Sequence, residues 1–123
     1  MGYYSQAAFV IKFDTKDNAA SYLEMAKSSM PLIIDYLQNI RITADGYIVA
    51  EFEYIKWYGS CEYIQALTKL YENSTGATGY QWYLFKRIGE DDTDYEEDCN
   101  EADGCEYVWE TIDFIRSLII NVH

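Results

Sequence analysis

The most restrictive feature of this 123-residue sequence is a run of acids in its C-terminal third. Ten carboxylates and no lysine or arginine lie between positions 90 and 106. Acidic runs of this kind most often form solvated loops, so we expect an acidic loop at 89–106. The whole chain has 21 acidic and nine basic residues, and without these ten acids eleven remain against the nine bases. One segment therefore supplies most of the net charge of −12.

The rest of the chain contains enough apolar side chains for one packed core. Hydrophobic residues make up 50 % and aromatic residues 17 % of the sequence, which argues against global disorder. A length of 123 residues is typical of one domain, so we expect a single domain over 1–123. We see no signal peptide, and no apolar run approaches the roughly 18 residues that a membrane span needs. A cytoplasmic protein that binds no membrane is expected.

Hydrophobic periodicity predicts an alternation of strands and helices. The turn at Asp45-Gly46 is expected to be a two-residue hairpin turn, because glycine adopts positive φ at little cost. The C-terminal stretch fits either a helix or a strand, and its β-branched and aromatic residues favour a strand. The expected elements are a strand at 5–13, helices at 15–28 and 31–38, a hairpin at Asp45-Gly46, a helix capped by Ser60, a strand at 80–88 and a β element within 106–122.

This order of elements predicts the fold class. It reads β-α-β-β-α-β, followed by the acidic connection and an additional C-terminal β element. Such an order is typical of the ferredoxin-like arrangement, in which helices cover one face of an antiparallel sheet. We therefore expect an α+β domain of ferredoxin-like type.

Patterns for catalysis or metal binding are weak. The only histidine is His123, so no base is available for Cys61, and Cys99 and Cys105 do not have the spacing of a zinc site. Calcium suits clustered acids, but an EF-hand loop starting at Asp92 has Glu97 where glycine must turn the chain. We predict no enzyme activity, no catalytic residue, no metal ligand and no cofactor, with a calcium-binding accessory domain as an alternative.

Two smaller clusters have ordinary explanations. Glu51 and Glu53 share one face of a predicted strand, which suits a solvent-facing side better than an acid–base pair. A group of aromatic residues between this strand and the next helix is more typical of the end of a core than of an exposed binding patch. Its members are Tyr54, Trp57, Tyr58 and Tyr63.

The spacing of the acids allows mimicry of a nucleic acid. Seventeen extended residues span up to about 58 Å, or about one carboxylate per 6 Å. Folded to about half that length, the segment carries about one charge per 3 Å, close to the roughly 3.4 Å of a single nucleic-acid strand. The segment therefore matches a phosphate backbone only if it is bent or pinned. The same negative field disfavours direct binding to nucleic acid.

Three local strings resemble a known group of proteins. They are MGYYSQAA, IKWYGSCEYIQAL and FKRIGEDDTDYEED, and they are similar to small acidic accessory proteins encoded by tailed bacteriophages. The resemblance implies a phage or mobile-element protein that acts in the bacterial cytoplasm. It further implies inhibition of a host defence, because acidic members of such groups often occupy nucleic-acid sites on nucleases or CRISPR complexes.

These observations lead to one functional expectation. We expect a non-enzymatic inhibitor, of anti-CRISPR or anti-nuclease type, that binds a basic nucleic-acid groove of a nucleic-acid-handling protein. An immunity protein that neutralises a toxin is a further alternative. Tyrosine is common in interface hot spots, so Tyr95 joins the acids as a contact residue. The expected partner-binding residues are Glu90, Asp91, Asp92, Asp94, Tyr95, Glu96, Glu97, Asp98, Glu101 and Asp103.

Overall fold

The strand Ser5–Phe13 (β1) lies at the centre of a five-stranded sheet whose neighbouring strands are all antiparallel. The computed structural model describes residues 5–57, 61–89, 95–100, 112–115 and 117–120, the last two ranges for their backbone only. The strand order is β2-β3-β1-β4-β5, and β6 and β7 form a separate two-stranded sheet. The remaining elements are α1 Lys16–Ser29, η1 Pro31–Asn39, β2 Ile40–Ile42, β3 Tyr47–Ile55, α2 Glu62–Glu72, η2 Asn73–Gly76, β4 Tyr80–Gly89, β5 Tyr95–Asn100, β6 Ile112–Ile115 and β7 Ser117–Ile120.

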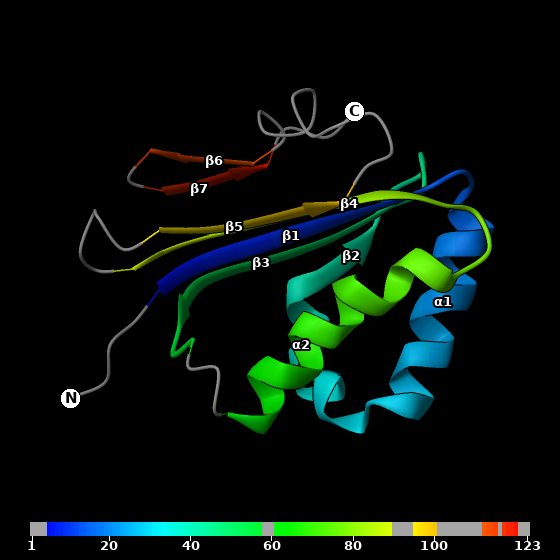
Figure 1. Cartoon of the computed structure of the whole chain (residues 1–123), viewed down its shortest axis with the longest axis horizontal. Helices are drawn as coiled ribbons and strands as arrows, with labels where there is room; N and C mark the ends of the chain where they lie inside the picture. Colours follow the sequence, from blue (N-terminus) through cyan, green and yellow to red (C-terminus); the bar gives the residue numbers. More distant parts are fainter. Residues whose placement is uncertain (1–4, 58–60, 90–94, 101–111, 116, 121–123) are drawn as a thin grey trace.

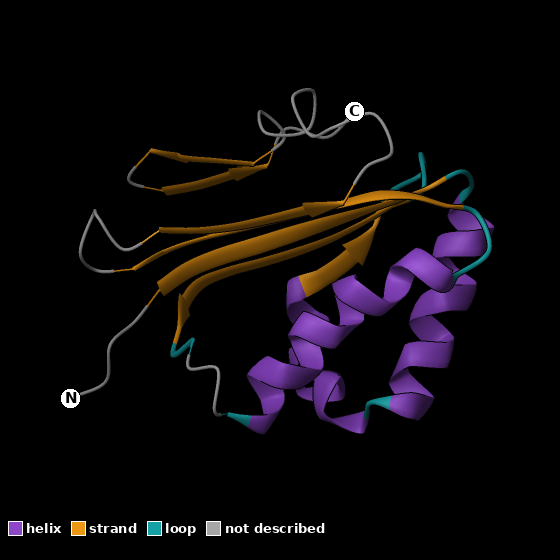
Figure 2. Cartoon of the chain, viewed as in Figure 1, coloured by secondary structure: helices purple, strands orange, loops and turns teal. Residues whose placement is uncertain are grey.

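The helices and the small hairpin lie on opposite faces of the large sheet. The helices α1, α2 and η1 cover one face, and the β6–β7 hairpin lies over the other, where β7 approaches β1 and β3 (Figure 1). Figure 2 shows the resulting order of layers, with helices, large sheet and hairpin in sequence. The expectation of an α+β fold with an antiparallel sheet is confirmed. No helix in the described part of the chain is long and apolar enough to cross a membrane.

The central strand is buried on both faces because both layers pack on it. Phe9 and Ile11 are fully buried in the core that the helices share with the sheet. Side chains alternate between the two faces of a strand, so Ala8 and Val10, which are also fully buried, face the hairpin side. A run of apolar residues with little polar alternation is typical of a strand covered on both sides.

Local signals place the helices where the sequence predicts them. Thr15 caps α1, since its side chain accepts a hydrogen bond of 3.1 Å from the backbone N–H of Asn18. Pro31 occupies the first position of η1, where the missing N–H costs no helical bond. The second long helix differs from the prediction, because α2 begins at Glu62 with Cys61 at its N-cap and no side-chain cap bond. Ser60, the expected cap, lies outside the described residues.

The hairpin between β2 and β3 turns at the expected glycine, but its loop is longer than two residues. Gly46 has a φ of 91°, as the prediction requires. Residues 43–46 separate the strands, and the N–H of Gly46 donates to the carbonyl of Thr43 at 3.1 Å. The loop is also bonded to the end of β1, where the N–H of Phe13 donates to the carbonyl of Gly46 at 2.8 Å.

Two predictions for the C-terminal third are settled by the described strands. The expected acidic loop at 89–106 contains a strand, since Tyr95–Asn100 forms β5 and pairs with β4. The preference for β structure near the C-terminus is confirmed at Ile112–Ile115 and Ser117–Ile120, which form two strands of a hairpin rather than one element.

The aromatic group after β3 belongs to the core where its side chains are described. Trp57 stacks on Phe85 with ring centroids 5.2 Å apart. Tyr63 stacks on Tyr36 with centroids 5.6 Å apart. Both are half-buried against the main core, which confirms the interpretation of these two as the end of the core. The other two members, Tyr54 and Tyr58, lie outside the described side chains.

Candidate functional site

Four of the predicted partner-binding residues lie on β5, the last strand of the large sheet. They are consecutive, and β4 is the only strand of the described residues that pairs with them. The six others lie outside the described residues. The four on β5 are Tyr95, Glu96, Glu97 and Asp98, and the six others are Glu90, Asp91, Asp92, Asp94, Glu101 and Asp103.

Glu96 is joined to a buried arginine of the neighbouring strand. Its carboxylate lies 2.7 Å from Nη2 of Arg87, which stands directly opposite in the ladder. Arg87 is only 6 % exposed, and its Nη1 donates to the hydroxyl of Ser5 at 2.9 Å. The side chain of Glu96 remains 55 % exposed. The ion pair therefore fixes the position of this carboxylate while leaving much of it open to a partner.

Asp98 shares a face of β5 with Glu96 and is held by a tyrosine. The hydroxyl of Tyr83 donates to Oδ2 of Asp98 at 3.0 Å. Burial raises the pKa of Tyr83, and its bond to Asp98 and the negative charge of that carboxylate raise it further. The phenol consequently stays protonated, and remains a donor, throughout the neutral pH range. Asp98 is half-buried. Its main role is therefore to hold β5 in place, and it adds less to the exposed charge of the strand.

The end of β5 is held by a third side chain of β4. The hydroxyl of Tyr80 lies 2.9 Å from Oδ1 of Asn100 and 3.1 Å from its backbone carbonyl. Together with the contacts of Arg87 and Tyr83, this places a side-chain bond at the beginning, middle and end of the β4–β5 ladder. The strand is thus fixed by more than its backbone hydrogen bonds.

The other face of β5 carries a second exposed acid of the strand. Glu97 is exposed and stands opposite the buried Lys86 in the ladder. Tyr95, two residues earlier on the same face, is 44 % exposed and donates its hydroxyl to the carboxylate of Glu97. Partial burial, this bond and the charge of Glu97 raise the pKa of Tyr95. The two side chains form a joined aromatic and acidic surface at the edge of the sheet.

Sequence reasoning missed the residues of β4 that hold the acidic strand. The sequence pattern predicts only a strand at 80–88 for Lys86 and Arg87, although cross-strand pairs of opposite charge stabilise antiparallel ladders. The signal is present in the sequence: the adjacent bases at 86–87 match the adjacent acids at 96–97 when the two segments run antiparallel. Reading the two segments against each other predicts a strand where acid content alone predicts a loop.

The cysteines and acids of the described residues form no group suited to a metal. No set of three or more His, Cys, Asp or Glu side chains in the described ranges could hold a metal ion. Cys99, on β5, is disulfide-bonded. Cys61 is a free thiol, so the sulfur that pairs with Cys99 lies outside the described residues.

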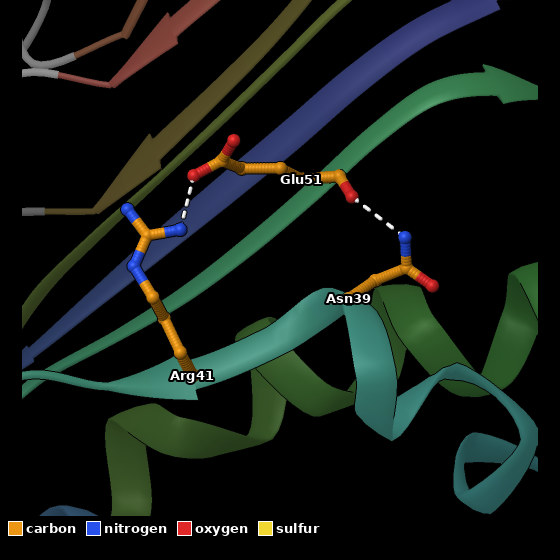
Figure 3. Close-up of polar contacts among 3 residues, drawn as sticks. All are labelled: Asn39, Arg41 and Glu51. Atoms are coloured by element: carbon orange, nitrogen blue, oxygen red, sulfur yellow. Dashed lines mark hydrogen bonds and ion pairs between the residues drawn. The ribbon is translucent and has the colours of Figure 1, made fainter.

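A separate hollow lies at the opposite edge of the sheet, between η1 and β3. An ion pair joins Arg41 of β2 to Glu51 of β3, and Nδ2 of Asn39 donates to the backbone carbonyl of Glu51 at 3.0 Å (Figure 3). Glu53 is exposed nearby on β3. The hollow has a volume of about 580 Å³. Its lining consists of Asp35, Tyr36, Gln38, Asn39, Arg41, Glu51, Phe52, Glu53 and Ile55.

Comparison with known proteins gave no relatives: no family model, curated protein or solved structure matches the chain.

Proposed function

We propose that this chain is a non-enzymatic inhibitor that binds a basic nucleic-acid groove of a host nuclease or CRISPR complex. The contact surface is the acidic segment, and β5 is the part of it that the structure describes. Its resemblance to small acidic phage proteins further suggests a phage or mobile element as its source and the bacterial cytoplasm as its place of action. The protein acts by occupying the groove, so it needs neither a cofactor nor a catalytic residue.

The spacing of charges along β5 supports this proposal. Successive residues of an antiparallel strand rise about 3.4 Å, so acids on one face of β5 stand about 6.8 Å apart, the distance between every second phosphate of one nucleic-acid strand. Glu96, Glu97 and Asp98 are consecutive on β5, although their side chains alternate between its two faces. Mimicry of a phosphate backbone requires that the segment is held in place, and side chains of β4 hold β5 in this way.

One observation carries the proposal: Glu96 is fixed by the buried Arg87 and is still 55 % exposed. A carboxylate on a flexible loop loses conformational entropy when a partner binds it. The ion pair places this carboxylate in advance, which reduces that loss. Glu97 and Tyr95 extend the exposed surface on the other face of the same strand.

We also propose that the first four strands with α1 and α2 form a ferredoxin-like unit. Their order along the chain is β-α-β-β-α-β. The sheet places β1 between β3 and β4, with β2 outside β3. In this proposal η1 is an insertion, and β5, β6 and β7 are additions that carry the acidic segment and cover the second face.

The test begins with the whole chain immobilised and exposed to bacterial lysate, then washed with rising salt. A captured protein is purified, and the chain is titrated into its complex with a labelled oligonucleotide. Competitive release of the oligonucleotide is expected. A partner that binds the chain and its oligonucleotide together would contradict the proposal. A captured toxin that handles no nucleic acid would favour the immunity-protein alternative, and binding that depends on Ca²⁺ would favour the calcium alternative.

The disulfide at Cys99 allows a further check of the cytoplasmic site of action. Disulfides are rare in a cytoplasm that keeps thiols reduced. Binding to the partner must therefore survive treatment with a reductant, and we expect less than about a threefold change in Kd, within the usual effect of a surface change. The affinity is measured before and after reduction with alkylation of the freed thiols. Loss of binding on reduction would place the active form in an oxidising compartment.

A further inference from the structure

The outer edge of β3 is open for half of its length. β2 pairs with β3 only from Ile48 to Ala50, whereas β3 continues to Ile55 (Figure 1). Among the described residues, no strand pairs with 51–55 on the β2 side. Unpaired backbone N–H and C=O groups at a sheet edge are a template for an added strand.

A side chain marks where the β2 ladder stops. Nδ2 of Asn39 donates to the backbone carbonyl of Glu51 at 3.0 Å (Figure 3). This carbonyl therefore points away from β1, toward the side of β3 on which β2 lies. The pairing of β3 with β1 shifts register just beyond it, between Phe52 and Ile55, and such bulges are frequent at sheet edges next to binding sites.

The helix η1 provides the second wall, so the open edge lies inside a groove. Tyr36 of η1 contacts Phe52 edge-on, with centroids 5.9 Å apart, and stacks on Tyr63 of α2 at 5.6 Å. Phe52 is buried and Tyr36 half-buried. Packing from both sides fixes the ring of Tyr36, and the hollow of about 580 Å³ beside it is preformed.

The charges around this groove favour a basic occupant. Asp35 and Glu53 are exposed carboxylates with no ion pair among the described residues, and Glu51 is already paired with Arg41. Burial raises the pKa of Tyr36, and the charge of Asp35 raises it further, which is consistent with a carboxylate close to the ring. An aromatic ring beside carboxylates suits a lysine or arginine side chain. Addition of a second copy of this chain would instead bring acidic edges together.

We propose that the groove between η1 and β3 binds an extended basic peptide segment, which adds as a strand along residues 51–55. Main-chain hydrogen bonds to β3 hold the segment, and a lysine or arginine side chain lies between Asp35, Glu53 and the ring of Tyr36. This site is independent of the acidic strand, because β2 and β5 are the opposite ends of the sheet order. The chain thus has two proposed contact surfaces for basic partners. The acidic strand binds through the spacing of its charges, and the groove binds by addition of a strand.

The test measures fluorescence anisotropy with a labelled seven-residue peptide that alternates lysine and valine. A matched peptide with glutamate in place of lysine is the first control, and the lysine peptide N-methylated on every residue, which removes the backbone donors of both edges, is the second. The lysine peptide alone is expected to bind. The double variant Asp35→Asn, Glu53→Gln should weaken it about tenfold, since two exposed charge pairs are lost. The variant Glu72→Gln, which removes an exposed acid at the end of α2, should leave its Kd unchanged.

Four results would overturn the proposal. Equal binding of the lysine and glutamate peptides would remove the role of charge, and equal binding of the N-methylated peptide would exclude strand addition. Amide NMR shifts at 95–100 instead of 51–55 would place the peptide on β5. No binding of the lysine peptide at about 1 mM, a concentration that detects even weak association, would show that the edge is not a peptide site. Circular dichroism of each variant verifies its fold.

Discussion

At the scale of single residues, Arg87 has the largest influence on the candidate site. It is buried and lies between Glu96 of β5 and Ser5 of β1. Its guanidinium connects three neighbouring strands of the sheet, because β4 stands between the other two. A buried charge that loses its partner is costly, so the position of the acidic strand and the stability of the fold depend on the same contact.

Neutralising Glu96 should therefore destabilise the protein, although its side chain is largely exposed. We expect Glu96→Gln to lower the free energy of unfolding by about 1–3 kcal/mol, because the buried Arg87 loses its charged partner. The neighbouring Glu97→Gln should change it by about 0.5 kcal/mol or less. Urea unfolding at pH 7 measures both. Equal effects of the two substitutions would show that the ion pair does not fix β5.

Gly46 is a second residue on which the fold depends. Its φ is 91°, and a Cβ at this position would lie 2.7 Å from the backbone carbonyl of Phe13. We expect Gly46→Ala to cost about 2–3 kcal/mol, from the strained φ together with the clash. A Cβ at Gly76 would meet no atom within 4 Å, and Gly76→Ala should stay within about 1 kcal/mol of wild type. Thermal unfolding compares the two variants directly, and similar Tm values would contradict the claim that alanine is strained at position 46.

At the scale of elements, a tyrosine links the two long helices. Tyr22 of α1 is buried and donates its hydroxyl to the backbone carbonyl of Leu70 of α2. Burial raises the pKa of Tyr22 to about 12. The phenol must be neutral where it lies, so the contact holds the helices together only while the proton is present.

This contact predicts a loss of stability in alkaline solution. The folded pKa of Tyr22 lies above the unfolded value of 10.0, so its contribution is complete below pH 10 and is lost as the pH rises toward 12. Tyr22→Phe should cost about 1 kcal/mol at pH 7, for the hydrogen bond, and should reduce the loss between pH 10 and 12. Urea unfolding at several pH values measures this. Tyr47→Phe, at a half-buried tyrosine of β3, is the control. An unchanged alkaline loss in Tyr22→Phe would contradict the assignment.

Elements with a strong periodic signal could be predicted from the sequence. The strand at 5–13 is rich in apolar residues, and Thr15 and Pro31 mark helix starts through their side-chain oxygen and missing N–H. These signals are local, and a single sequence contains them in full. The C-terminal strands were harder, since their apolar residues fit both periods, and the preference for β structure rested on side-chain shape alone.

The strand β5 could not be predicted by the same reasoning. Acids are depleted in strands because they pack poorly on a pleated surface, and YEEDCN has no apolar face. Its strand structure depends on partners of β4, chiefly Arg87, which lies 9 residues from Glu96 along the chain, and Tyr83, which lies 15 residues from Asp98. The acidic character of the candidate site was therefore predictable, while its attachment to the sheet was not. The groove beside η1 depends equally on contacts between distant elements.

At the scale of the whole molecule, exposed acidic residues lie at both edges of the large sheet. The net charge is −12, and β5, the described part of the acidic segment, lies at one end of the sheet order, with the η1–β3 groove at the other. Charged residues at sheet edges also discourage association between copies of a chain. The same acids that we propose for partner binding thus oppose edge-to-edge pairing of the protein with itself.

The central claim, that the acidic segment replaces a phosphate backbone in a basic groove, is tested most directly by the salt dependence of binding. The variant Glu90→Gln, Asp91→Asn, Asp92→Asn, Glu97→Gln removes four charges and keeps Glu96 and Asp98, which hold β5. Its Kd for the purified partner is measured from low to high salt beside wild type and the control Glu24→Gln, Glu72→Gln. We expect weaker binding, by about tenfold or more at low salt, and a flatter dependence on salt, with the control unchanged. Full affinity and an unchanged salt dependence in the four-acid variant would contradict the account.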